Sequence, residues 1–213
     1  MMMENYRTIQ KNGLHEIEIK KSRFICHLKR VETEEEAQAF IEEIKKEHWK
    51  ATHNCSAYTI GMNNEIQRAH DDSEPSGTAG VPMLEIFLKR ELKNVVAVVT
   101  RYFGGTKLGA GGLIRAYGGA VNDAIDYIGV VERQLQRLID ITVTYSQSGK
   151  VENALREANY AIQDIIYAEN ITYQCIIPLE SEEKFIEDIT NWTSAQADIH
   201  IGQQSWIEVP VKQ

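Results

Sequence analysis

The sequence is poor in the residues that cross-link or stiffen a chain, with 3 cysteines and 4 prolines in 213 residues. Cys26, Cys55 and Cys175 lie far apart and form no C-x-x-C pair. An odd number of scattered cysteines argues against a disulfide framework and a closed zinc site, and it is typical of a reducing compartment. We therefore predict a cytoplasmic protein.

Long apolar runs are also missing. No stretch approaches the ~20 apolar residues of a membrane span. Residues 1–20 contain no apolar segment between a basic head and a small-residue cleavage site. We therefore expect neither a membrane segment nor a signal peptide.

The chain has no overall excess of cations, since its formal net charge is −8. Residues 1–133 carry 18 of the 23 Lys+Arg and 19 of the 31 Asp+Glu, which gives a net charge of −1, whereas residues 134–213 have a net charge of −7. This asymmetry indicates two domains, 1–133 and 134–213. We expect only the first domain to meet a polyanion, through a local patch.

Hydrophobic periodicity predicts an α+β fold. In the first domain it predicts strands at 14–19, 24–28, 52–62 and 94–100, and a loop at 71–80. It also predicts three helices: one at 33–49, one that begins between residues 78 and 82 and ends at 92, and one at 111–128. The second domain shows strand, helix, two strands, helix, strand, which is the ferredoxin-like βαββαβ pattern. The boundary is placed near 131–136, where "VERQLQR" has charge and little core.

Glycine is concentrated in one window: residues 101–120 hold 7 of the 14 glycines, three cations and no acid. A strand, a glycine-rich turn and a helix in this order present backbone N–H groups to an anion, and missing Cβ atoms allow close approach. The predicted anion- or partner-binding residues are Arg101, Gly104, Gly105, Lys107, Gly109, Gly111, Gly112 and Arg115.

This window matches neither common phosphate fingerprint. It lacks the G-x-x-x-x-G-K-[ST] spacing, and Ile114 stands where the third glycine of G-x-G-x-x-G would be. The alternative is close packing, with Gly118 and Gly119 letting the helix lie near a sheet. Tyr102 and Phe103 also have two interpretations: they stack on nucleic-acid bases or anchor the loop in the core.

The segment "HDDSEPSGT" forms a second polar loop, whose secondary site candidates are Asp71, Asp72, Glu74, Ser76 and Thr78. Carboxylates beside hydroxyls suit Mg²⁺. Asp and Ser also form turns and cap helices, and we favour this structural interpretation over a magnesium site. His53 and Cys55 on one strand face suggest a metal pair or a Cys–His dyad. A packed core cysteine is favoured because no third ligand is placed. We predict no metal, cofactor or catalytic residue.

Three ordered stretches, "THNCSAYTIG", "DDSEPSGTAGVPML" and "VVAVVTRYFGGTKLGAGGLIRAYGGAV", resemble the Impact family over roughly residues 15–130. The resemblance implies that residues 1–133 fold like the second domain of ribosomal protein S5. That α/β sandwich also occurs in elongation factor G and in small-molecule kinases of the GHMP type. Residues 134–213 resemble the ferredoxin-like domain of bacterial members, itself similar to the fifth domain of elongation factor G.

The same resemblance implies a role linked to translation, in which the Gly-rich cationic loop contacts RNA, the ribosome or a translation factor. From the sequence we expect no DNA specificity and no membrane partner, and we predict no particular oligomeric state. The alternative is a Mg-dependent enzyme or a binding protein for a nucleotide or phosphorylated small molecule, which would explain carboxylates and cations in one domain. Because no nucleophile or base is identifiable, we favour a binding protein over an enzyme.

Overall fold

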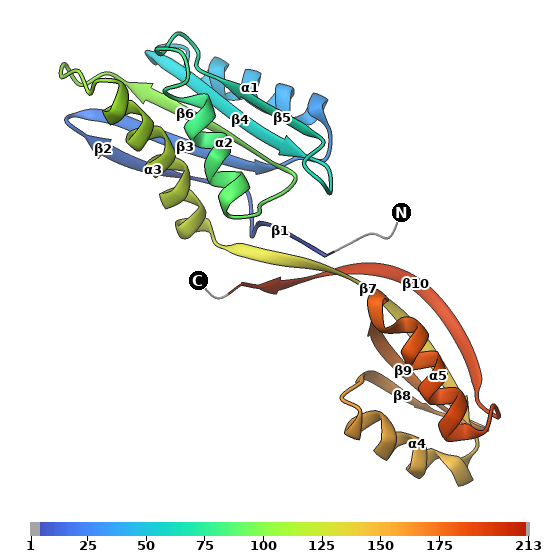
Figure 1. Ribbon diagram of the computed structural model, residues 1–213. Coiled ribbons are helices and arrows are strands. Elements are labelled where there is room, and N and C mark those ends of the chain that lie inside the picture. The colour runs from blue at the N-terminus through green and yellow to red at the C-terminus, as the bar shows by residue number, and fades with distance from the viewer. Residues whose placement is uncertain (1–4, 212–213) are drawn as a thin grey trace. The chain divides into compact units, whose positions relative to one another are not determined.

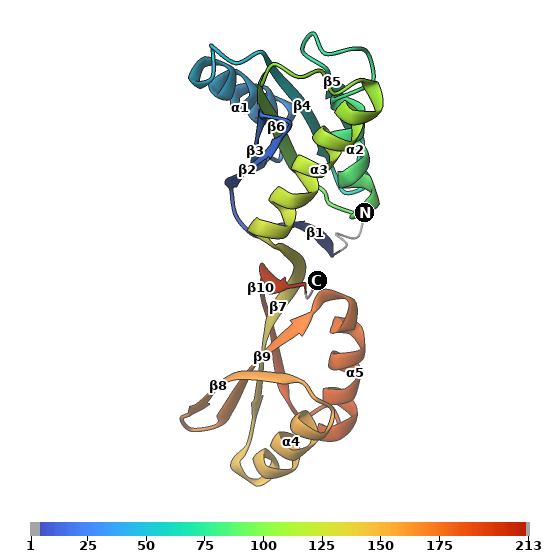
Figure 2. The same ribbon diagram turned by 90° about the vertical axis from the view of Figure 1, so that its left-hand side faces the viewer.

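The computed structural model describes residues 5–211, which form two compact units. Unit 1 comprises the described residues up to Arg133 together with those from Glu208 on, and unit 2 is Gln134–Ile207. Each unit combines helices with antiparallel strands (Figures 1 and 2). The predicted α+β class with two domains is therefore confirmed.

Unit 1 is built on an antiparallel sheet whose strand order is β2-β3-β6-β4-β5. The strands are β2 (Gly13–Ile19), β3 (Ser22–Arg30), β4 (His53–Ile60), β5 (Ile66–His70) and β6 (Val95–Tyr102). Helix α1 (Glu34–Glu47) covers one face, and α2 (Gly80–Lys89) and α3 (Ala110–Ile128) cover the other (Figure 1). The central strand β6 is buried on both faces, as its β-branched run predicts.

The helix boundaries follow local signals. Thr33 Oγ1 accepts a hydrogen bond from the Glu36 N–H at 3.2 Å, and the Glu36 carboxylate accepts one from the Glu32 N–H at 2.7 Å. This reciprocal capping confirms the predicted start of α1. Helix α2 ends at Lys89 and not at Leu92, because the chain reverses at Glu91, where φ is +56°.

Two strands are missing from the sequence prediction. β5 is short and mostly polar at the edge of the sheet, and β1 (Tyr6–Ile9) has four residues. Neither is long enough to show a clear alternation. β1 pairs with the first residues of β7 (Val130–Val143), from Ile9↔Val130 to Tyr6↔Arg133.

Strand β7 also contradicts the expectation of little core near 131–136. The strand is continuous there, and Val131 and Leu135 are buried. A second feature that the pattern did not indicate is the return of the chain to unit 1 from Glu208 on.

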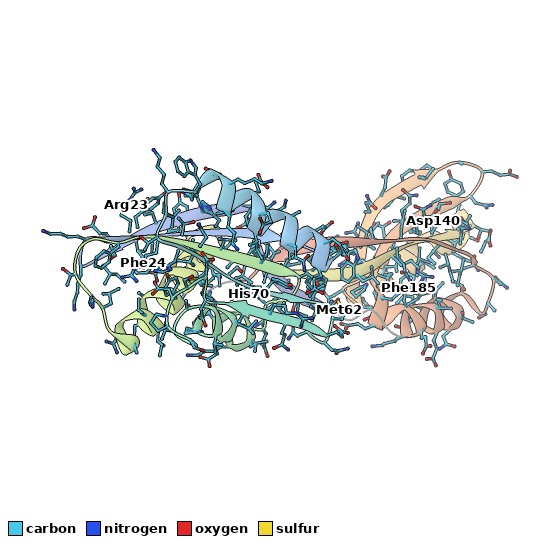
Figure 3. The ribbon with its side chains drawn as sticks, turned by 90° about the horizontal axis from the view of Figure 1, so that it is seen from above. Arg23, Phe24, Met62, His70, Asp140 and Phe185 are labelled. Atoms are coloured by element: carbon cyan, nitrogen blue, oxygen red, sulfur yellow. The ribbon has the colours of Figure 1, made fainter. Side chains whose placement is uncertain are left out.

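Unit 2 has the predicted βαββαβ order, and the strands run β10-β7-β9-β8 across its sheet. After β7 come α4 (Tyr145–Glu157), β8 (Ala161–Tyr167), β9 (Ile171–Pro178), the short 3₁₀ helix η1 (Leu179–Ser181), α5 (Glu182–Thr193) and β10 (Asp198–Pro210). Each unit has its own core, marked by Phe24 in unit 1 and by Phe185 in unit 2 (Figure 3).

Candidate anion-binding site

The glycine loop, residues 103–109, joins β6 to α3 and rests on the β2–β3 hairpin. The Gly104 N–H donates a hydrogen bond to Ser22 Oγ at 3.1 Å. A Cβ at position 104 would lie 2.0 Å from the backbone carbon of Lys21, so only glycine fits there. Lys20 and Lys21 form the tip of the hairpin, with φ of +49° and +65°. The close approach at Gly104 therefore brings this tip and the glycine loop to one end of the sheet.

Four cations at this end are exposed, and within residues 5–211 none of them forms an ion pair. They are Lys20, Lys21, Lys107 and Arg115, which we call the cationic surface. Arg23 in the same hairpin differs, because its Nε is 2.6 Å from Glu16 Oε1. Lys107 and Arg115, both predicted from the sequence, thus remain available to a partner.

The N-terminus of α3 adds backbone donors. The helix follows Gly109, whose φ is +72°, and it has neither a side-chain cap nor an acid in its first turn. The first intrahelical bond runs from the Leu113 N–H to the Gly109 oxygen at 2.9 Å. In the described part of the chain, no acceptor is bound by the N–H groups of Ala110, Gly111 and Gly112. Unbonded amides at a helix start attract anions.

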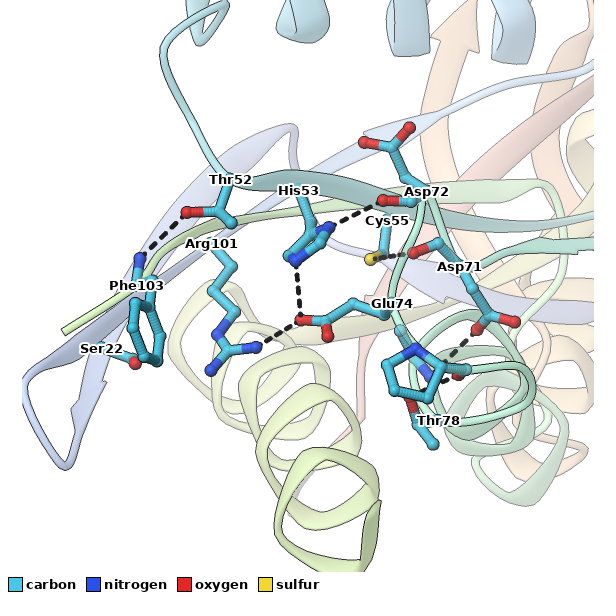
Figure 4. Close-up of polar contacts among 12 residues, drawn as sticks. Ser22, Thr52, His53, Cys55, Asp71, Asp72, Glu74, Thr78, Arg101 and Phe103 are labelled. Atoms are coloured by element: carbon cyan, nitrogen blue, oxygen red, sulfur yellow. Dashed lines mark hydrogen bonds and ion pairs between the residues drawn. The ribbon is translucent and has the colours of Figure 1, made fainter. Parts of the chain in front are cut away.

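Arg101 is not a free cation of this surface, although the sequence suggested that it flanks the turn as one. Its side chain is 6% exposed, and its Nη1 lies 2.6 Å from Glu74 Oε1 (Figure 4). The same oxygen accepts a hydrogen bond from Tyr117 Oη at 2.7 Å, and His53 Nε2 lies 3.7 Å away. The ion pair therefore ties the polar loop 71–78 to β6 and leaves Arg101 neutralised.

The carboxylate of Asp71 caps α2. It accepts hydrogen bonds from the N–H groups of Gly77 at 2.8 Å, Ala79 at 3.0 Å and Gly80 at 2.9 Å. Burial alone would raise the pKa of Asp71, but these donors outweigh it and hold the pKa below its ordinary value. The predicted capping role is confirmed. Because both oxygens are engaged, the arrangement speaks against Asp71 as a magnesium ligand.

The neighbours of Asp71 are also engaged in local structure. Asp72 Oδ2 accepts a hydrogen bond from the Asn54 N–H at 2.6 Å, and its carbonyl oxygen accepts one from His53 Nδ1 at 2.8 Å. Thr78 is buried and donates to the Pro75 oxygen at 2.6 Å, whereas Ser76 is exposed. No group of three or more side chains suited to a metal ion occurs within residues 5–211.

Cys55 is a packed core residue, as predicted. It is fully buried and its Sγ donates to the Asp71 oxygen at 2.9 Å. Burial raises the pKa of this thiol, which keeps it protonated and unreactive.

The helix glycines of α3 do not serve packing on the sheet. A Cβ at Gly118 would lie 3.7 Å from the Pro82 oxygen, so this residue lies against α2. A Cβ at Gly119 would meet nothing within 4 Å. In the loop, Gly105 has a φ of +89° and is likewise open around its missing Cβ.

A pocket of ≈ 400 Å³ that is open to solvent lies between the two loops. It is lined by Thr52, His53, Glu74, Pro75, Arg101, Phe103, Lys107, Leu108, Gly109, Ala110 and Leu113. Sequence reasoning missed Thr52, Leu108 and Leu113, which carry no chemical signal of their own. It also missed Tyr117, whose hydroxyl reaches Glu74 from a core position of α3.

The comparisons with known proteins agree with this architecture. The chain matches the Impact N-terminal domain over residues 20–125 and a domain of unknown function over residues 141–196. It is 54% identical over 210 residues to the IMPACT family member YvyE of Bacillus subtilis. The matched residues cover 99% of this chain and 97% of that protein. The chain therefore belongs to the Impact family, which confirms the resemblance seen in the sequence.

Two further matches are more distant. The chain is 37% identical over 112 residues to a protein named Protein IMPACT homolog in Dictyostelium discoideum, covering 51% of this chain and 31% of that one. A solved structure titled as that of a hypothetical protein matches with a TM-score of 0.60 at 30% identity, covering 93% of this chain and 97% of that one. In the described residues, no helix is long and apolar enough to cross a membrane.

Proposed function

We propose that this protein is a translation-associated binding factor that contacts RNA phosphates through the cationic surface and the first amides of α3. One observation carries the proposal: exposed cations and helix amides, all without partners among residues 5–211, lie around one glycine-rich loop. Phosphate is the anion that this combination suits best. Membership of a family with eukaryotic IMPACT relatives supports the link to translation.

The charge distribution limits the size of the contact. Residues 134–213 have a net charge of −7 and repel a polyanion. We therefore expect a footprint confined to unit 1 and a shallow salt dependence. About four phosphates bound as a single strand give a slope of log K against log[salt] of about −3. A slope near −10 would mean many more contacts than this surface offers.

The test is recovery of partners from a cell lysate at moderate salt. The wild-type chain is compared with the double variant Lys107→Ala/Arg115→Ala and with the control Lys11→Ala/Lys89→Ala, which removes two exposed lysines elsewhere in unit 1. All three are first shown to be folded. The proposal expects ribosomal RNA or ribosomal proteins with the wild type and the control, and their loss with the double variant.

Two other results contradict the proposal. Equal loss with both double variants means that net charge, and not the glycine loop, drives the association. Absence of RNA and ribosomal proteins from the wild-type recovery overturns the translation-linked role itself.

A further inference from the structure

The floor of the pocket between the two loops carries unused hydrogen-bonding groups. The side chains of Glu74 and Arg101 are 3% and 6% exposed. Glu74 Oε1 is bound by Arg101 and Tyr117, but within residues 5–211 no group donates to Glu74 Oε2. Arg101 Nε is buried without an acceptor in that range, and the hydrogen bond of this guanidinium to Glu74 uses Nη1 and leaves Nη2 free of any acceptor among the same residues. Since buried polar groups normally have partners, the orphaned Nε marks an unsatisfied guanidinium, and because both residues line the pocket the floor can offer Glu74 Oε2 as an acceptor and Arg101 Nη2 as a donor to a ligand.

One wall of the pocket is formed by a partly exposed aromatic residue, Phe103. Phe103 is 49% exposed. Its backbone N–H donates to Thr52 Oγ1 at 3.1 Å, and the Arg101 Cζ lies 5.6 Å from its ring centroid. The backbone of Phe103 is therefore anchored, and its side chain lies beside Arg101 and is still accessible. Leu108 and Leu113 extend the apolar lining beside it.

The rim of the pocket contains the anion-binding groups already described. Gly109, Ala110 and Lys107 line it, so the start of α3 and a free ammonium group face the same space as Phe103. A ligand that contacts the floor, the aromatic wall and the rim together needs an anionic group, a flat apolar ring, and a ring edge with both a hydrogen-bond donor and an acceptor. A nucleoside monophosphate unit has these three parts.

We propose that this pocket holds one unstacked nucleotide. Its phosphate lies at the start of α3 beside Lys107, its base packs on Phe103, and the edge of the base faces Glu74 and Arg101. A volume of ≈ 400 Å³ is within the usual range for small-ligand pockets. Where the nucleotide belongs to an RNA strand, the inference rests on the proposed function. It then adds a requirement for an unpaired base, because a base stacked in a duplex cannot enter.

The test measures binding of the full chain to three probes by fluorescence anisotropy or competition. The probes are a labelled 12-nucleotide oligouridylate, a blunt 12-base-pair RNA duplex and free uridine monophosphate. Phe103→Ala removes the ring, and Phe103→Trp restores a larger one. Tyr127→Ala is the matched control, since Tyr127 is 71% exposed at the other end of α3. Phe103 is half exposed, so its variants are expected to fold.

We expect tighter binding of the single strand than of the duplex. Phe103→Ala should weaken single-strand binding roughly 5- to 150-fold, the usual contribution of one base–aromatic stack, and leave duplex binding unchanged. Phe103→Trp and Tyr127→Ala should bind like the wild type. Equal binding of strand and duplex without any effect of Phe103→Ala overturns the pocket and leaves the RNA-binding function standing.

The remaining outcomes separate the two sources of the nucleotide. If neither RNA binds but uridine monophosphate does, and Phe103→Ala abolishes that binding, the pocket serves a free nucleotide and the proposed function fails. If none of the three probes binds, both proposals are overturned.

Discussion

Replacing Glu74 by glutamine tests whether a buried carboxylate holds the polar loop 71–78 on β6. Glutamine keeps the size and one carbonyl oxygen but removes the negative charge. Arg101, which remains charged at any accessible pH, then has a side chain 6% exposed next to a neutral amide. Tyr117 keeps an acceptor, so the main loss is the counter-ion at 2.6 Å.

The magnitude follows from burial. Removing one partner of a buried ion pair costs about 3–5 kcal/mol, because the other charge stays buried without compensation. The matched control is Glu91→Gln, which breaks the pair Arg7–Glu91 at 3.2 Å, where the two side chains are 43% and 73% exposed. Such an exposed pair contributes about 1 kcal/mol or less. We therefore expect the free energy of unfolding of unit 1 to fall several times more in Glu74→Gln than in Glu91→Gln.

Hydrogen exchange followed by mass spectrometry resolves this difference, because β6 reports on unit 1 and β9 on unit 2. About 3–5 kcal/mol corresponds to faster exchange of the β6 amides by roughly two to three and a half orders of magnitude. The β9 amides should be unaffected. If β6 exchanges no faster in Glu74→Gln than in Glu91→Gln, the ion pair does not stabilise unit 1 and the reasoning is refuted.

The structure also fixes the sign of the effect of four further substitutions. Gly104→Ala should lower the melting temperature because its Cβ would collide with Lys21. Gly119→Ala should raise the free energy of unfolding by up to about 1 kcal/mol in a urea titration, because alanine stabilises a helix more than glycine does and its Cβ meets nothing within 4 Å there. Asp71→Ala should cost about 2 kcal/mol at pH 7. The difference in stability between the wild type and Asp71→Ala should shrink as pH falls through the lowered folded-state pKa of Asp71, because the wild-type carboxylate is protonated there. An equal cost at pH 7 and at pH 2 would show that the charge of Asp71 does not stabilise the start of α2. Burial and the neighbouring His48 lower the pKa of His27 to about 4 from 6.5, so the unfolded state binds more protons between these values. Stability should therefore decline from pH 6.5 toward pH 4, and His27→Gln should flatten that decline in urea titrations across this range.

The parts of the fold that sequence reasoning found are those set by neighbouring residues. The uninterrupted run in β6 and the Thr33–Glu36 pair each carry their signal within a few positions. β5 and β1 were missed because pairing partners, and not their own side chains, make them strands. An edge strand with polar side chains cannot be predicted from hydrophobic periodicity.

In the candidate site, too, sequence reasoning found the residues that local composition marks and missed the contacts between residues far apart in the chain. Local composition marked Lys107, Arg115 and the glycines, and the structure places them around an uncapped helix start. The Arg101–Glu74 pair spans 27 positions, and the Tyr117–Glu74 hydrogen bond spans 43. No spacing rule connects residues at such separations. For that reason a cation that the sequence assigned to the surface lies in a buried pair.

The return of the chain to unit 1 has a consequence for synthesis and folding. Arg30 is held by Glu208, with Nη1–Oε1 at 2.5 Å and Nη2–Oε2 at 3.0 Å, and the Val211 N–H donates to the Val130 oxygen at 3.0 Å. A nascent chain acquires these partners only after all of unit 2 has been translated. Unit 2 is thus an insertion within unit 1, and a fragment that stops at Arg133 leaves Arg30 without its carboxylate. The first unit to be synthesised is consequently the last to be completed.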